Sequence, residues 1–137
     1  METVPRGSET VLLVEADPET RKLAAFMLQK RGYTVVEARS TADALQLYES
    51  GQVHADLLLT EVLMPKMSGT KLATRLREMD ALLRVLYMSH AADRTMRELA
   101  IDLEVGFLRK PFTMGMLAGK VRQALDAPRA RALGTNV

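Results

Sequence analysis

The stretch LLLTEVLMPKMSG, residues 57–69, joins an apolar run to a glutamate and then to a proline and a Ser-Gly turn. The run ADLLLT (Ala55–Thr60) is continuously apolar after its first residues, which is typical of a central parallel strand covered on both faces. Glu61 follows this predicted strand directly. A charged side chain at the tip of so apolar a strand needs an explanation, and the rest of the chain supplies one.

Four further strand–helix units accompany this one along the chain. The predicted strands are Thr10–Val14, Tyr33–Ala38, Ala55–Thr60, Arg84–Ser89 and Val105–Arg109. The predicted helices are Pro18–Arg31, a helix capped by Ser40 or Thr41 that ends near Ser50, Ser68–Met79, Arg94–Ile101 and a helix capped by Thr113 that ends near Leu125. Strands that alternate with helices predict an α/β fold, with a five-stranded parallel sheet that carries helices on both faces.

Local signals define the ends of the first helix. Asp17 is a good N-cap residue, Pro18 suits the first helical position, and Gly32 is a C-terminal stop. The residues expected to form the buried face of this helix by their helical spacing are Leu23, Phe26, Met27 and Lys30.

Length and composition exclude several classes of protein. A chain of 137 residues suits one domain, predicted here as residues 10–126 between an extension (1–9) and a flexible tail (127–137). The absence of cysteine excludes disulfides and cysteine-based sites, and it fits the cytoplasm. No apolar run approaches the ~20 residues of a membrane span, so no membrane partner is expected. A net charge of +2 and only six aromatic residues argue against nucleic acid as a partner.

Polar residues gather just after the predicted strands. The carboxyl ends of parallel strands meet at one edge of a doubly wound sheet, and ligands of such sheets bind there. Acids, a hydroxyl and a lysine on neighbouring strand ends therefore outline a site for ions. The residues at these positions are Glu15, Ala16 and Asp17 after the first strand, Glu61 after the third, Ser89 at the end of the fourth, and Lys110 with Pro111 after the fifth.

Four motifs show a resemblance to a known family. These motifs are VLLVEADPE, DLLLTEVLMPKMSG, VLYMS and FLRKPF, and the likeness covers residues 10–125. In these motifs the chain resembles the receiver domain of two-component response regulators. The resemblance implies a flavodoxin-like, doubly wound sheet with strand order 2-1-3-4-5. It also implies that a histidine kinase donates a phosphoryl group to an aspartate at the tip of the third strand, with Mg²⁺ offsetting the charge on the phosphoryl oxygens.

Carried over by motif, most of the family's functional positions are filled. Lys110 matches the family's lysine, and Pro111 its usual proline, which often follows a cis peptide bond. Ser89 matches the hydroxyl that binds the phosphoryl group. Glu15 matches the first acid of the metal-binding pair, and the carbonyl of Leu63 would face the metal.

Two positions depart from the family pattern. Glu61 stands where the phosphorylated aspartate belongs, and its extra methylene moves the carboxylate roughly 1.5 Å outward. A misplacement of about 1 Å can lower the rate of a positioned reaction about 100-fold. Ala16 stands where the second metal-binding acid belongs and offers no oxygen ligand. Asp17 is expected to cap the first helix rather than to replace that acid. The sequence therefore predicts that Glu61 is not a competent phosphoacceptor, that Mg²⁺ binding is weak or absent, and that no other cofactor is used.

Three interpretations of single residues stay open. With one acid missing, Glu61 is expected to reach Lys110 and Ser89, either as a partial mimic of the phosphorylated state or as an inert pair with Lys110. Phe107, at a switch position of the family, is expected to pack inward. His90 either crowds the pocket or lies exposed in a loop.

These residues predict a receiver-type signalling domain that acts as a phosphorylation-independent protein-interaction module and not as an enzyme. Its expected partners are a histidine kinase or another signalling protein, with a dimer through the face of the fourth and fifth strands and helices as a further expectation. The alternative is a receiver that still accepts phosphate at an atypical site. A small flavodoxin-like enzyme is disfavoured, because no glycine-rich loop follows the first strand.

Overall fold

A computed structural model describes residues 4–91, 93–99 and 106–127. Its five strands form one parallel sheet in the order β2-β1-β3-β4-β5, so the predicted fold class and strand order are confirmed. The strands are β1 (Thr10–Val14), β2 (Thr34–Ala38), β3 (Leu57–Glu61), β4 (Arg84–Ser89) and β5 (Phe107–Arg109). The helices are α1 (Pro18–Lys30), α2 (Thr41–Glu49), α3 (Gly69–Met79), α4 (Asp93–Glu98) and α5 (Met114–Asp126).

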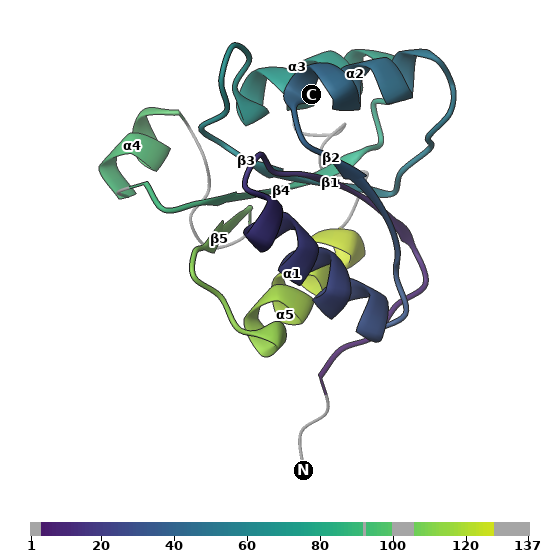
Figure 1. Cartoon of the computed structure of the whole chain (residues 1–137), viewed down its shortest axis with the longest axis vertical. Coiled ribbons are helices and arrows are strands. Elements are labelled where there is room, and N and C mark those ends of the chain that lie inside the picture. The colour runs from purple at the N-terminus through teal and green to yellow at the C-terminus, as the bar shows by residue number, and fades with distance from the viewer. Residues whose placement is uncertain (1–3, 92, 100–105, 128–137) are drawn as a thin grey trace.

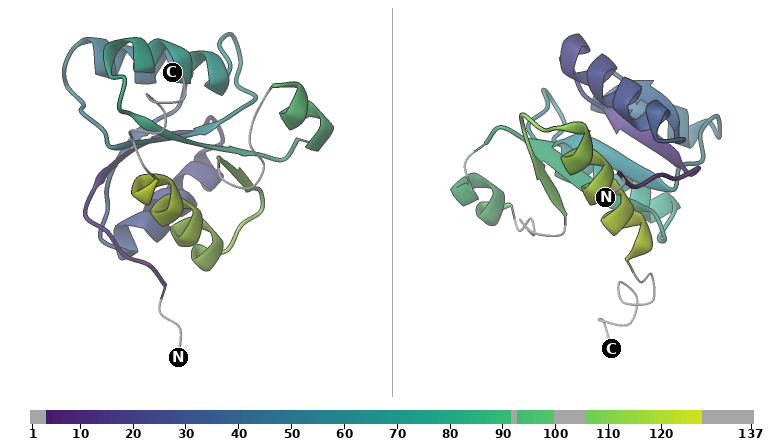
Figure 2. Two further views of the ribbon diagram at one scale, coloured as in Figure 1. Left: turned by 180° about the vertical axis from the view of Figure 1, so that it is seen from behind. Right: turned by 90° about the horizontal axis from the view of Figure 1, so that it is seen from below.

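Helices cover both faces of the sheet (Figure 1). Helices α1 and α5 lie on one face, and α2 and α3 lie on the other, as the view from behind also shows (Figure 2). Two apolar clusters fill the space between these layers, and the central strand β3 supplies residues to both, with Leu57 and Leu59 on one side and Leu58 on the other. All five residues of β3 are buried, which explains the continuous apolar run in the sequence.

The predicted strand and helix ends need small corrections. Strand β3 includes Glu61, which the sequence placed just beyond the strand. The predicted fourth helix ended at Ile101 and the predicted fifth strand began at Val105; both residues lie outside the described part of the chain. Ser40, rather than Thr41, caps α2 by accepting a hydrogen bond from the Asp43 N–H.

The predicted buried face of α1 was wrong. Leu23 and Phe26 are 51% and 53% exposed, and Lys30 is exposed, whereas Met27 is half-buried against the core. The residues that face the sheet instead are Ala24, Ala25 and Leu28. Both sets fit a helical period. The prediction gave too little weight to Ala24 and Ala25, whose small side chains let α1 pack closely on the sheet while Leu28 fills the core beside them.

Candidate functional site

Four strand ends bring the predicted site residues together at the carboxyl edge of the sheet. Glu15 follows β1, Glu61 ends β3, Ser89 ends β4 and Lys110 follows β5. The register pairs Glu61 with Met88, one residue before Ser89, so neighbouring strands end at the same level. All four residues are buried, although charged side chains are seldom buried unless they are paired.

Lys110 joins the two carboxylates. Its Nζ donates a hydrogen bond to Oε1 of Glu61 at 2.5 Å and another to Oε1 of Glu15. Burial by itself disfavours the charged ammonium, but the hydrogen bonds to Glu15 and Glu61 outweigh it and raise the pKa of Lys110 above its ordinary value. Lys110 is therefore a permanent cation between two carboxylates, and we call these three residues the triad.

Backbone amides hold the remaining carboxylate oxygens of the triad. Oε2 of Glu61 accepts a hydrogen bond from the Leu63 N–H at 3.0 Å, and Oε2 of Glu15 accepts one from the Asp17 N–H at 3.0 Å. Each of the four carboxylate oxygens thus has a donor. A buried network of charges in which every oxygen has a donor is rigid, because moving one partner would leave a buried charge unpaired.

Residues that the sequence did not single out hold the backbone of the triad in place. Nη1 of Arg21 donates to the Glu15 carbonyl at 2.8 Å, while its Nε donates to Oε1 of Glu37 at 3.2 Å. A Cβ on Gly69 would lie 2.2 Å from the Glu61 carbonyl oxygen, so only glycine fits there. The sequence signal for Gly69 was the Ser-Gly turn itself, whereas nothing in the sequence pointed to Arg21.

The other predicted site residues are less involved. The Ser89 hydroxyl accepts a hydrogen bond from the Ala91 N–H at 3.0 Å, and no bond within the described residues joins it to Glu61, so that expected contact is not formed. Phe107 is 3% exposed and packs against Val62 and Met96, so the prediction that it packs inward is confirmed. The Lys110–Pro111 peptide bond is cis, as the resemblance implied.

The structure shows the roles of two loop residues, Asp17 and His90. Asp17 caps α1: its Oδ2 accepts hydrogen bonds from the Thr20 N–H at 3.1 Å and from the Thr20 hydroxyl at 2.6 Å. These hydrogen bonds lower the pKa of Asp17, and the predicted capping role is confirmed. His90 is exposed, as one of its two interpretations expected.

The divalent cation that the resemblance implies would need several oxygen ligands at this edge of the sheet. Ala16 is exposed and supplies no side-chain oxygen, and the ammonium of Lys110 already lies between the two acids. Within residues 4–91, 93–99 and 106–127, no three His, Asp or Glu side chains are grouped closely enough to hold a metal ion. Mg²⁺ prefers several carboxylate, phosphate and water oxygens, so the residues present do not fit it.

Comparison with known proteins agrees with the fold. The sequence profile of the response regulator receiver domain matches residues 11–122. The chain is 39% identical over 121 residues to the sensor kinase CckA of Brucella abortus, covering 88% of this chain and 13% of that kinase. It is 30% identical over 118 residues to the response regulator receiver protein CpdR of Brucella abortus, covering 85% of this chain and 97% of CpdR.

A solved structure supports the same relationship. The crystal structure of the receiver domain from the hybrid histidine kinase CckA superimposes with a TM-score of 0.69 at 32% sequence identity, over 85% of this chain and 99% of that one. The chain spans only about an eighth of the whole CckA kinase. Within the described residues, no helix has the length and apolar character that crossing a membrane requires.

Proposed function

The chain belongs to the response regulator receiver domain family of two-component signalling, and from this premise we propose that it is a protein-interaction module that works without phosphorylation. The observation that carries the proposal is the triad, in which Lys110 bridges Glu15 and Glu61. The module is not an enzyme and uses no cofactor. Its partners are signalling proteins, among which a histidine kinase fits the family.

Phosphoryl transfer to Glu61 would require a free carboxylate oxygen. Oε1 of Glu61 is bonded to Lys110, and Oε2 is bonded to the Leu63 N–H. Transfer also needs a cation on the phosphoryl oxygens, and Ala16 removes one ligand for it. To attack, a Glu61 oxygen would have to break its hydrogen bond to its donor. Because of the extra methylene, it would still be displaced from the position that an aspartate oxygen takes. Both effects argue against transfer.

The same contacts favour one fixed arrangement of the domain. Lys110 donates a hydrogen bond to an oxygen of Glu61, as the family's lysine does to a phosphoryl oxygen, and Phe107 is buried. We propose that Glu61 thereby replaces the phosphoryl group in part, with one charge against the roughly two of a phosphoryl group. The surface of β4, β5, α4 and α5 is the proposed contact face for a partner or for a second copy.

The alternative function, phosphotransfer at an atypical acceptor, keeps one observation in its favour. Ser89 is buried and its hydroxyl accepts from the Ala91 N–H, and Lys110 lies at the expected strand end, so two groups that hold a phosphoryl group in the family remain in place.

Labelling with a small phosphodonor separates the two functions. The full chain is incubated with acetyl phosphate and Mg²⁺, and the phosphoryl adduct is measured by intact-protein mass spectrometry. We expect no adduct on the wild-type chain and a clear adduct on the double variant Glu61→Asp with Ala16→Asp, which restores the family pattern. The single variant Glu61→Asp is the matched control and should label weakly, because the metal ligand is still missing. Stoichiometric adduct on wild-type Glu61 would overturn the proposal.

A further inference from the structure

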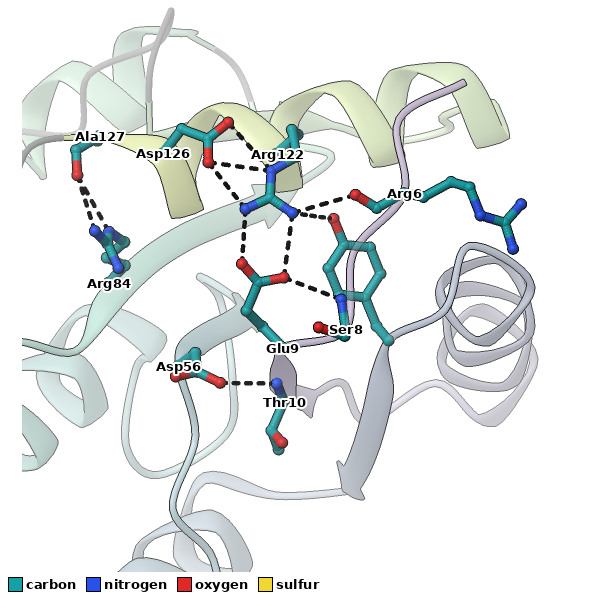
Figure 3. A network of polar contacts seen from close by, with 10 residues as sticks. Arg6, Ser8, Glu9, Thr10, Asp56, Arg84, Arg122, Asp126 and Ala127 are labelled. Atoms are coloured by element: carbon teal, nitrogen blue, oxygen red, sulfur yellow. Dashed lines mark hydrogen bonds and ion pairs between the residues drawn. The ribbon is translucent and has the colours of Figure 1, made fainter. Parts of the chain in front are cut away.

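Arg122 of α5 binds the segment that precedes β1 (Figure 3). Its Nη2 donates to Oε2 of Glu9 at 2.7 Å, and its Nη1 donates to Oε1 of the same carboxylate at 3.1 Å. Nη1 also donates to the Arg6 carbonyl at 3.2 Å. One guanidinium therefore recognises both a side chain and the backbone of residues 6–9, in the paired geometry that makes Arg–carboxylate contacts strong.

The body of the domain holds this guanidinium in position. Nε of Arg122 donates to both carboxylate oxygens of Asp126, at 3.2 Å and 3.1 Å, and Nη2 donates to Oδ1 at 2.9 Å. Nη1 donates to the Tyr33 hydroxyl at 3.3 Å. Because Asp126 and Tyr33 lie outside residues 6–9, Arg122 is oriented whether or not that segment is bound, and a preoriented receptor loses less entropy on binding.

Backbone hydrogen bonds set the path of the segment. The Gly7 N–H donates to the Arg31 carbonyl at 3.0 Å, and the Thr34 N–H donates to the Glu9 carbonyl at 3.1 Å. One acceptor just after α1 and one donor in β2 thus hold the segment. This is the manner in which proteins bind extended peptides, with the main chain giving affinity and side-chain positions giving selectivity.

Sterics select glycine at one position of the segment. A Cβ on Gly7 would lie 2.4 Å from Cε1 of Tyr33 and 2.6 Å from Nη1 of Arg122. Gly32, with a φ of 104°, faces the same place, since its own Cβ would lie 2.2 Å from the Gly7 carbonyl oxygen. The two glycines let two backbones approach more closely than side chains would allow.

We propose that Arg31, Tyr33, Thr34 and Arg122 form a peptide-binding edge whose ligand is an extended segment with a glycine followed two positions later by a carboxylate. Residues 6–9 are this ligand in cis, and the same segment of a second copy of the chain is its ligand in trans. This proposal does not depend on the proposed function, because the edge lies on residues other than the triad.

Release of the segment is energetically accessible. Arg6 and Ser8 are exposed, and the side chain of Glu9 keeps 30% of its surface in solvent. Because solvent reaches the Glu9 carboxylate, water can replace part of its contact with Arg122 when the segment leaves. The tether that joins residues 6–9 to β1 raises their effective concentration to the millimolar range, so a free peptide competes only when the cis segment is weakened.

The experiment uses the full chain with Glu9→Gln, which weakens the cis segment, and with Ser8→Cys carrying an environment-sensitive dye. The chain has no other cysteine, so the dye is placed uniquely. The probe is a capped synthetic peptide of residues 4–10, VPRGSET. We expect the peptide to displace the labelled segment in a saturable manner. The matched peptide with Gly7→Ala should bind at least about tenfold more weakly, because its Cβ overpacks the site.

Two controls keep the outcome decisive. The full chain with Arg122→Gln in addition to Glu9→Gln should not respond specifically to the peptide, because the carboxylate receptor is gone. If Glu9→Gln impairs folding, as judged by circular dichroism, Glu9→Asp replaces it and weakens the same contact. An equal response to both peptides, or no displacement by the VPRGSET peptide up to its solubility limit, would overturn the proposal.

Discussion

Replacing Lys110 by methionine tests how strongly the triad depends on its cation. Methionine keeps much of the apolar stem and removes the ammonium, so the change leaves the Glu15 and Glu61 carboxylates buried and facing each other. Removing one partner of a buried ion pair costs about 3–5 kcal/mol. A domain of this size has about 5–15 kcal/mol of stability, so Lys110→Met should fold but should be clearly destabilised.

Urea unfolding followed by circular dichroism at pH 7.5 measures this loss. Lys71→Met, on the exposed surface of α3, is the matched control and should change the free energy of unfolding by no more than about 0.5 kcal/mol. Adding Glu61→Gln to Lys110→Met should restore about 1–3 kcal/mol, because it removes one of the two unpaired charges. A Lys110→Met chain within about 1 kcal/mol of wild type at pH 7.5 would refute the reasoning.

Three further outcomes follow from other contacts. Gly69→Ala should cost about 1–3 kcal/mol in urea unfolding, because its Cβ would lie 2.2 Å from the Glu61 carbonyl oxygen; an unchanged midpoint would contradict that close approach. Ser68→Ala should lower the free energy of unfolding by about 1 kcal/mol, because α3 loses its N-cap. Ser68→Asp should keep most of that stability, because aspartate also accepts the capping hydrogen bond. The hydrogen bond from Arg122 lowers the pKa of Glu9 from 4.5 to about 2. The stabilising contribution of the ionised Glu9 is therefore fully present above pH 4.5 and is lost as the pH falls toward 2. The free energies of unfolding of wild type and Glu9→Gln should converge across that range. A constant difference between them would argue against the Glu9–Arg122 contact.

The fold could be predicted because the local sequence signals for strands, N-caps and helix ends agree with the tertiary structure. Strand β3 is buried over its whole length, and its apolar run leaves no other placement. The N-caps Asp17 and Thr113 accept hydrogen bonds from Thr20 and Met116, as their residue types predict. Gly32 ends α1 with a positive φ that other residues adopt rarely.

The sequence indicated which residues form the candidate site but not how they bond. The strand ends place Glu15, Glu61 and Lys110 at one edge, and order along the chain suffices for that. Side-chain rotamers and burial decide which carboxylate oxygens bind Lys110. They also decide that Lys110 binds both acids at once. Among the described residues no bond joins Glu61 and Ser89: the two carboxylate oxygens of Glu61 accept from Lys110 and from the Leu63 N–H, and the Ser89 hydroxyl accepts from the Ala91 N–H.

Long-range contacts were beyond the sequence pattern. Leu23 and Phe26 are as apolar as core residues, and only the close packing of α1 against the sheet decides that its alanines face inward. The contact between Arg122 and Glu9 joins residues 113 positions apart, and no local signal encodes it.

A magnesium titration followed by nuclear magnetic resonance measures whether Lys110 keeps a divalent cation out of the triad. The amides of Leu63 and Asp17 donate to the two carboxylates of the triad, so they report any metal that takes those oxygens. At millimolar Mg²⁺ the account predicts no specific shift of these two resonances in the wild-type chain, and a saturable shift in the Glu61→Asp, Ala16→Asp variant. A saturable shift of both resonances in the wild-type chain would show that Lys110 yields its place to the metal, and would contradict the account.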